Sequence, residues 1–247
     1  MSDGLKVFIV GSARSGTSIT YFAMREVFGL VGRGESHVFP IFQRIVHMFF
    51  EYRQKFENVQ GVLAGELNVR IFKDYLFVYI RDLYSKAYKT NSFVDKTPGA
   101  EAIRGCGLIL GAFPDARIIM TRRNGIEVVK SFQSKFGTSF EDACRAWSQC
   151  ALASAQIRDT HPDILEIDQY DLTNAPEETA LKIAEHLHRP EKAKQLAMFF
   201  ATRRVEKLSD HDWQRRLTLA DVDWPEEAKE TFRRICGEQM HELGYAL

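Results

Sequence analysis

A glycine-bounded loop follows the first apolar run of the chain and reads Gly-Ser-Ala-Arg-Ser-Gly-Thr-Ser over residues 11–18. Such a loop, when it leads into a helix, offers backbone N–H groups and the positive end of the helix dipole to an anion. Arg14 adds a guanidinium suited to phosphate oxygens. The loop therefore predicts a phosphate site, against the alternative of a tight strand–helix turn. The predicted contacts are Ser12, Ala13, Arg14, Ser15, Gly16, Thr17 and Ser18.

The loop differs from the phosphate loop of nucleoside triphosphatases at one decisive position. Gly11 and Gly16 have the required spacing, but Thr17 stands where the lysine belongs. Without that lysine the terminal phosphates of a triphosphate lose a main contact. The loop thus fits a shorter anion, such as a 5′-phosphate carrying one further group. A small-molecule kinase of the P-loop class remains an alternative.

A second polar cluster follows the apolar run Arg117–Thr121. Arg122 and Arg123 end the predicted strand, and Asn124 is the expected N-cap of a helix. Ser131 lies seven residues after Asn124, so two helical turns return it to the same face. Arg123 and Ser131 can then converge on one anion. The alternative is a solvated arginine pair and an ordinary helix serine.

Together, the two clusters resemble the donor-binding motifs of sulfotransferases that use 3′-phosphoadenosine 5′-phosphosulfate (PAPS). Residues 13–18 resemble the 5′-phosphosulfate loop, and the pair Arg123 and Ser131 resembles the 3′-phosphate motif. The resemblance covers residues 5–37 and 92–135. It implies PAPS as cofactor, adenosine 3′,5′-bisphosphate as product, and a small hydroxyl acceptor. No metal is implied, because no Mg²⁺-ligand carboxylate follows the loop.

The segment Gly32–Ser36 resembles bacterial sugar sulfotransferases in which a glutamate is the proposed base. It implies Glu35 as the base that removes the acceptor proton, with His37 as second candidate, and a carbohydrate or other alcohol as acceptor. Gly34 departs from the pattern, which has proline there. The alternative is that Glu35 pairs with Arg33 and that His37 is a loop histidine.

Lys96 occurs in Asp-Lys-Thr-Pro, residues 95–98, which resembles a Lys-Ser/Thr-Pro segment near the active site of related sulfotransferases. A cation there could hold the sulfonate. Alternatively, Lys96 pairs with Asp95 on the surface. Trp213, Arg215 and Arg216 resemble a basic loop that closes over the cofactor in the family, where they would stack on adenine and bind the 3′-phosphate. The alternative is a surface loop.

The surrounding pattern predicts an α/β fold of the P-loop type, with helices on both faces of a parallel central sheet. The whole chain, residues 1–247, is expected to form one domain. Residues 29–34 are expected to be a loop, and the helices 41–56 and 66–88 to lie between the first and second strands. The insertion 38–90 would then form a helical cap over the acceptor.

Composition narrows the class of protein. Lys+Arg and Asp+Glu number 33 each, so no global field favours nucleic acid or an acidic membrane. The four cysteines form no CxxC pair and are expected to be reduced and mostly buried. No signal-like or membrane-length apolar run is present, so a cytoplasmic enzyme is expected. A non-catalytic nucleotide-binding module remains an alternative, and the oligomeric state stays open.

Overall fold

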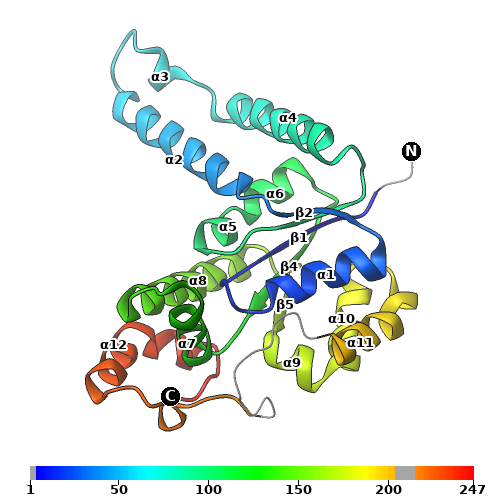
Figure 1. Ribbon diagram of the computed structural model, residues 1–247. Helices are drawn as coiled ribbons and strands as arrows, with labels where there is room; N and C mark the ends of the chain where they lie inside the picture. Colours follow the sequence, from blue (N-terminus) through cyan, green and yellow to red (C-terminus); the bar gives the residue numbers. More distant parts are fainter. Residues whose placement is uncertain (1–3, 204–214) are drawn as a thin grey trace.

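The computed structural model describes residues 4–203 and 215–247, and its centre is a five-stranded sheet with helices on both faces (Figure 1). All strands are parallel, in the order β2-β3-β1-β4-β5. The strands are β1 (Lys6–Gly11), β2 (Val31–Glu35), β3 (Phe93–Lys96), β4 (Arg117–Arg122) and β5 (Leu165–Asp168).

The helices fill the connections between strands and the C-terminal part. Before β4 they are α1 (Thr17–Phe28), α2 (Val38–Phe56), α3 (Leu63–Glu66), α4 (Val69–Tyr88), α5 (Ala100–Arg104) and α6 (Cys106–Ala112). After β4 they are α7 (Gly125–Phe136), α8 (Phe140–Thr160), α9 (Gln169–Asn174), α10 (Pro176–His186), α11 (Ala193–Thr202) and α12 (Glu226–Glu242), with 3₁₀ turns η1 (Pro190–Lys192) and η2 (Leu219–Asp221).

The two faces of the sheet bury separate cores because side chains alternate along each strand. On β1, Val7 and Ile9 face a core built with α1, α9, α10 and α11. Phe8 and Val10 face the opposite core, built with α2, α4, α5, α6 and α8. A third cluster joins α7, α8 and α12. The predicted α/β fold with a parallel sheet between helical layers is confirmed.

The segment after α1 is a strand, so the prediction of a loop over residues 29–34 was wrong. Val31–Glu35 forms β2, an edge strand whose one partner among the described residues is β3. It alternates between exposed and half-buried positions and contains two glycines. A strand with so little apolar content gives no strand signal in the sequence. The long helices consequently lie between β2 and β3, and not between the first two strands of the chain.

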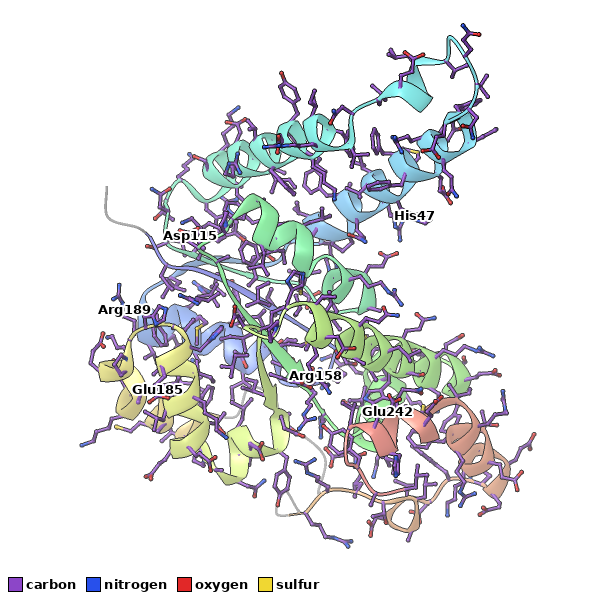
Figure 2. All side chains as sticks on the ribbon, turned by 180° about the vertical axis from the view of Figure 1, so that it is seen from behind. His47, Asp115, Arg158, Glu185, Arg189 and Glu242 are labelled. Atoms are coloured by element: carbon purple, nitrogen blue, oxygen red, sulfur yellow. The ribbon has the colours of Figure 1, made fainter. Side chains whose placement is uncertain are left out.

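The helices α2, α3 and α4, residues 38–88, form an arm that extends from the sheet (Figure 1). The rings of Phe49 and Phe72 stack along its seam with centroids 3.8 Å apart. At its base Phe39 is buried against Phe8 of β1, with ring centroids 5.5 Å apart. His47 is exposed on α2 and is labelled in Figure 2, which shows the molecule from behind. The arm therefore joins the core of the sheet through side chains of both α2 and α4.

All four cysteines are buried and free: Cys106, Cys144, Cys150 and Cys236. Burial raises the pKa of the Cys106 thiol to about 12, which keeps it protonated at neutral pH. No helix in residues 4–203 and 215–247 is long and apolar enough to cross a membrane.

Substitution of Phe8 by alanine tests the aromatic core between sheet and arm. Phe8 is buried and its ring meets those of Phe39 and Phe93 edge to face. We expect the substitution to lower the free energy of unfolding by about 3–5 kcal/mol, since it removes a large buried ring and leaves a cavity. Urea unfolding measures this. The control Phe136→Ala, on an exposed ring of α7, should cost less than about 1 kcal/mol, and equal losses would contradict the assigned core.

Candidate active site

The polar residues singled out in the sequence gather at one edge of the sheet, where the carboxyl ends of all five parallel strands meet. Gly11 ends β1, Glu35 ends β2, and Lys96 ends β3. The chain enters β1, builds β2 and β3 on one side of it, and then crosses to β4 on the other side. Ligands of open α/β sheets bind at such a reversal of strand order. The reversal here lies between β1 and β4.

The loop after β1 is held by its own buried hydroxyl. Ser15 is fully buried, and its Oγ donates to the carbonyl of Ser12 at 2.5 Å and lies 2.7 Å from Oγ1 of Thr121 on β4. Gly11 has a φ of 146°, and a Cβ there would lie 2.3 Å from the carbonyl oxygen of Thr121. Arg14 adopts the left-handed region with φ 68°. The loop thus packs closely against β4, and the hydrogen bonds of Ser15 hold it there.

The first turn of α1 has the features of an anion site. Its N-cap is Gly16, and none of the side chains in the described part of the chain caps it. The first N–H groups of a helix need partners outside the helix. Anions satisfy these groups and are also favoured by the helix dipole. The geometry therefore fits the predicted phosphate loop.

The two predicted anion motifs touch each other. Nε of Arg14 donates to Oγ of Ser131 on α7 at 2.8 Å. Nη1 of Arg123 donates to the carbonyl of Arg14 at 3.2 Å. Arg14, Arg123 and Ser131 therefore form one continuous polar surface across the β1 and β4 junctions, although they come from distant parts of the sequence.

Hydrogen bonds fix the position of Arg123, and they come from residues that the sequence did not mark as functional. Its Nε donates to Oε2 of Glu127 at 2.6 Å, and both side chains are about nine-tenths buried. The indole N–H of Trp147 donates to the carbonyl of Arg123 at 3.0 Å. Oε1 of Glu127 accepts the backbone N–H of Leu217 at 3.2 Å. The spacing of four residues, across the start of the predicted helix, was the available signal for the Arg123–Glu127 pair.

A second polar chain leads from the phosphate loop to the end of β2. Nζ of Lys96 donates to Oγ of Ser18 at 3.1 Å and lies 2.8 Å from Oε1 of Glu35. Nε2 of His37 lies 3.0 Å from Oε2 of the same carboxylate. Lys96 is buried and its ammonium also lies over the ring of Tyr21. The structure therefore brings together the loop, the cation and both candidate bases.

The charge state of Glu35 follows from this contact. Burial raises the pKa of Glu35, but the hydrogen bond and positive charge of Lys96, joined by His37, outweigh burial and hold the pKa below its usual range. Glu35 is thus a carboxylate at neutral pH, which is the form that can accept a proton. Its partners in the described residues are Lys96 and His37, and not Arg33.

The sequence left open whether Lys96 pairs with Asp95 on the surface. In the structure the two side chains do not pair. Consecutive residues of a strand point to opposite faces, and Asp95 is buried beneath the arm. Its carboxylate accepts hydrogen bonds from Tyr84 and Ser36, at 2.6 and 2.9 Å. Lys96 points instead to Ser18 and the site.

The C-terminal arginines have carboxylate partners in this structure. Arg215 pairs with Asp221 at 2.6 Å. Arg216 pairs with Asp168 at 3.1 Å, and its guanidinium lies against the rings of Tyr170 and Tyr245. Their contact with a nucleotide stays a prediction. Trp213 lies outside the described residues.

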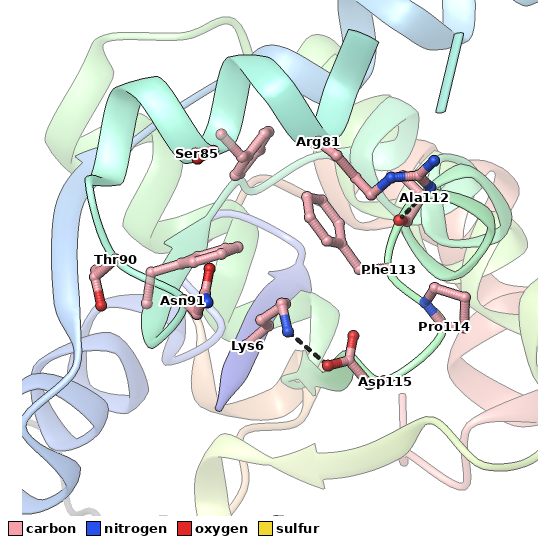
Figure 3. A pocket seen from close by; sticks show the side chains of 11 residues that line it. Lys6, Arg81, Ser85, Thr90, Asn91, Ala112, Phe113, Pro114 and Asp115 are labelled. Atoms are coloured by element: carbon pink, nitrogen blue, oxygen red, sulfur yellow. Dashed lines mark hydrogen bonds and ion pairs between the residues drawn. The ribbon is translucent and has the colours of Figure 1, made fainter. Parts of the chain in front are cut away.

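A hollow of about 320 Å³ lies at the opposite edge of the sheet, between the start of β1 and the end of α4 (Figure 3). Lys6 pairs with Asp115 there at 2.5 Å, and Arg81 donates to the carbonyl of Ala112 at 3.1 Å. None of the predicted site residues lines it. Within the described ranges, no group of three or more His, Cys, Asp or Glu side chains is placed to hold a metal ion.

Comparison with known proteins gives this geometry a family. The model of the sulfotransferase family matches residues 6–193, about three quarters of the chain. The chain belongs to the sulfotransferase family. The matched range includes both anion motifs, Glu35 and Lys96, and ends before Arg215.

Solved sulfotransferases share the fold. The sulfotransferase domain of the Synechococcus PCC 7002 olefin synthase covers 100% of this chain and 97% of its own, with TM-score 0.58 and 15% identity. The sulfotransferase domain from the curacin biosynthetic pathway covers 99% of both chains, with TM-score 0.56 and 15% identity. Sulfotransferase STF9 of Mycobacterium avium covers 100% of this chain and 79% of its own, with TM-score 0.54 and 12% identity.

A curated relative, an uncharacterized protein of Aquifex aeolicus (strain VF5), is 25% identical over 214 residues. The match covers 82% of this chain and 28% of the relative. The chain therefore spans little more than a quarter of that protein's length.

The Lys96→Met variant tests the electrostatic coupling at the site. Without the ammonium, burial raises the pKa of Glu35 unopposed by Lys96, so we expect this pKa to be higher in the variant than in wild type. On acidification, Glu35 of the variant would then become protonated, and stop accepting protons, at a higher pH than Glu35 of wild type. Carbon-13 NMR titration of labelled glutamates measures the change. Lys86→Met, at an exposed lysine in the last turn of α4, serves as control; an unchanged Glu35 titration in Lys96→Met would refute the coupling.

Proposed function

We propose that this sulfotransferase uses PAPS as donor and transfers its sulfonate to a hydroxyl of a small acceptor. The observation that carries the proposal is the direct contact of Arg14 with Ser131, together with the hydrogen bond from Arg123 to Arg14. One nucleotide can span these two motifs if it carries phosphate groups at both 5′ and 3′ positions. The 5′-phosphosulfate would bind the N–H groups of residues 12–18, and the 3′-phosphate would bind Arg123 and Ser131.

The contacts around Lys96 support a mechanism for this transfer. With PAPS bound, the acceptor oxygen would attack sulfur, the bond from sulfur to the 5′-phosphate oxygen would break, and adenosine 3′,5′-bisphosphate would leave. Lys96, bonded to Ser18 at the loop, would stabilise charge on the sulfonate and leaving oxygens, aided by Arg14 and the loop N–H groups. A bound sulfonate would share the positive charge of Lys96 with Glu35, which would make the carboxylate a better base. Glu35 then takes the acceptor proton.

The acceptor would approach from the side of β2 and the base of the arm. Glu35 and His37 have exposed side chains there, and His37 leads directly into α2. A carbohydrate or other alcohol is the proposed acceptor class, and residues 38–90 would form one wall of its pocket within a single domain, residues 1–247. Arg215, Arg216 and Trp213 are proposed to lie beside the bound nucleotide. A cytoplasmic location is proposed with this function.

The Arg123→Ala variant tests the 3′-phosphate site. Wild type should bind adenosine 3′,5′-bisphosphate more tightly than AMP, because only the former reaches Arg123 and Ser131. The variant should lose about tenfold to a hundredfold in affinity for the bisphosphate, the effect of about 1.5–3 kcal/mol for a charged hydrogen bond. Its affinity for AMP should hardly change. Isothermal titration calorimetry measures all four values.

Two controls accompany this test. Arg145→Ala removes an equal charge from an exposed position on α8 and should leave both affinities unchanged. ATP with Mg²⁺ tests the kinase alternative. Equal loss of bisphosphate and AMP affinity in Arg123→Ala would refute the assignment, and ATP-dependent phosphorylation of an acceptor would replace sulfonate transfer by kinase chemistry.

The Glu35→Gln variant tests the base. The amide keeps the shape of the side chain but cannot take a proton at neutral pH, so turnover should fall by about a hundredfold to ten-thousandfold. Binding of adenosine 3′,5′-bisphosphate should persist. Radiolabelled PAPS with trehalose, glycerol and 4-nitrophenol as acceptors measures transfer. The parallel variant His37→Asn should lose much less activity; the reverse order would move the role of base to His37.

A further inference from the structure

Asp95 is a buried carboxylate that accepts hydrogen bonds from hydroxyl groups of three different parts of the chain. Oδ2 accepts from Tyr84 at 2.6 Å and from Tyr88 at 3.3 Å, both on α4. Oδ1 accepts from Ser36, after β2, at 2.9 Å and from Thr97, after β3, at 3.3 Å. In the described residues no arginine or lysine pairs with it. A buried polar group with this many partners fixes their relative positions.

β2 needs such a fixed point because its own pairing is weak. It is an edge strand, and its register with β3 shifts between Gly32 and Glu35. Irregular pairing and glycine leave the register of a strand weakly specified. Beyond the irregularity, Glu35 again lies opposite Lys96. The place of Glu35 beside Lys96 therefore depends on what holds the chain after the irregularity.

The turn that follows Glu35 supplies the missing constraint. The N–H of Ser36 donates to the carbonyl of Lys96 at 3.3 Å, and its hydroxyl reaches Asp95. His37 has a φ of 51°, a left-handed conformation that costs free energy for a residue with a side chain. Its N–H donates to Oγ1 of Thr97 at 3.2 Å, and Thr97 in turn bonds to Asp95. Both residues after Glu35 are thus held, directly or through Thr97, by one carboxylate.

We infer that Asp95 is a positioning residue: it holds the turn after β2 against β3 and thereby keeps Glu35 beside Lys96. The inference rests on the proposed function for its catalytic consequence. Because Asp95 also accepts hydrogen bonds from Tyr84 and Tyr88 of α4, it links the base of the arm to this turn. Small displacements of a base from its reacting atom lower turnover strongly. Loss of the network should therefore lower turnover and leave the affinity for the nucleotide unchanged.

The test uses Asp95→Asn, which keeps the size of the side chain but replaces one acceptor oxygen by an NH2 donor, so it can no longer accept hydrogen bonds from both the turn and the tyrosines. Affinity for adenosine 3′,5′-bisphosphate should stay within about twofold of wild type. Turnover with the best acceptor of the trehalose, glycerol and 4-nitrophenol panel should fall at least tenfold. The pKa of Glu35, followed by carbon-13 NMR, should rise from its lowered value because the contact with Lys96 is loosened.

A matched pair of variants separates positioning from general stability. Thr97→Val removes the hydroxyl that links His37 to Asp95 and should reproduce part of both effects. Thr97→Ser keeps the hydroxyl and should restore wild-type turnover and Glu35 titration. If Asp95→Asn fails to fold, Ser36→Ala removes a single bond to the same carboxylate and carries the same readouts.

The outcomes distinguish this inference from the proposed function. Wild type that neither binds the bisphosphate nor transfers sulfonate would overturn the function, while the Glu35 titration of the variants still tests positioning. A Glu35 pKa unchanged in Asp95→Asn and in Thr97→Val would overturn the inference even if sulfonate transfer is established.

Discussion

The parallel pairing of β1 with β4 is the constraint on which the candidate site depends. It sets Gly11 opposite Thr121, so the loop after β1 and the arginine after β4 emerge side by side. Ser15 is bonded to Thr121 and fixes the loop against that strand. Arg14 then reaches Ser131 across the junction. Two anion motifs more than a hundred residues apart become one surface because two buried strands are neighbours.

The part of the site formed by Lys96 and Glu35 depends on the irregular pairing of β2 with β3. Lys96 ends β3, a fully buried strand next to β1, so its place beside the phosphate loop follows from the core. Glu35 ends an irregular edge strand and is brought to Lys96 by the turn after it. The position of Glu35 therefore depends on side-chain hydrogen bonds of the turn, whereas that of Lys96 follows from the buried sheet.

The sequence predicted the parts that depend on local pattern. Apolar runs predicted β1 and β4, and Asn124 was correctly identified as the cap of α7, where it accepts from Ile126. β2 was missed because its glycines and exposed positions carry no apolar signal. The burial of Asp95 beneath the arm was also hidden, because its partners Tyr84 and Tyr88 come from a helix whose packing the sequence does not specify. Contacts between distant segments were inferred only where a family resemblance paired them.

The most direct test of the central claim is a crystal structure with adenosine 3′,5′-bisphosphate. We expect one nucleotide spanning both junctions, with its 5′-phosphate on the N–H groups of residues 12–18 and its 3′-phosphate within hydrogen-bonding distance of Arg123 and Ser131. A nucleotide bound elsewhere, or one whose 3′-phosphate lies away from Arg123, would contradict it.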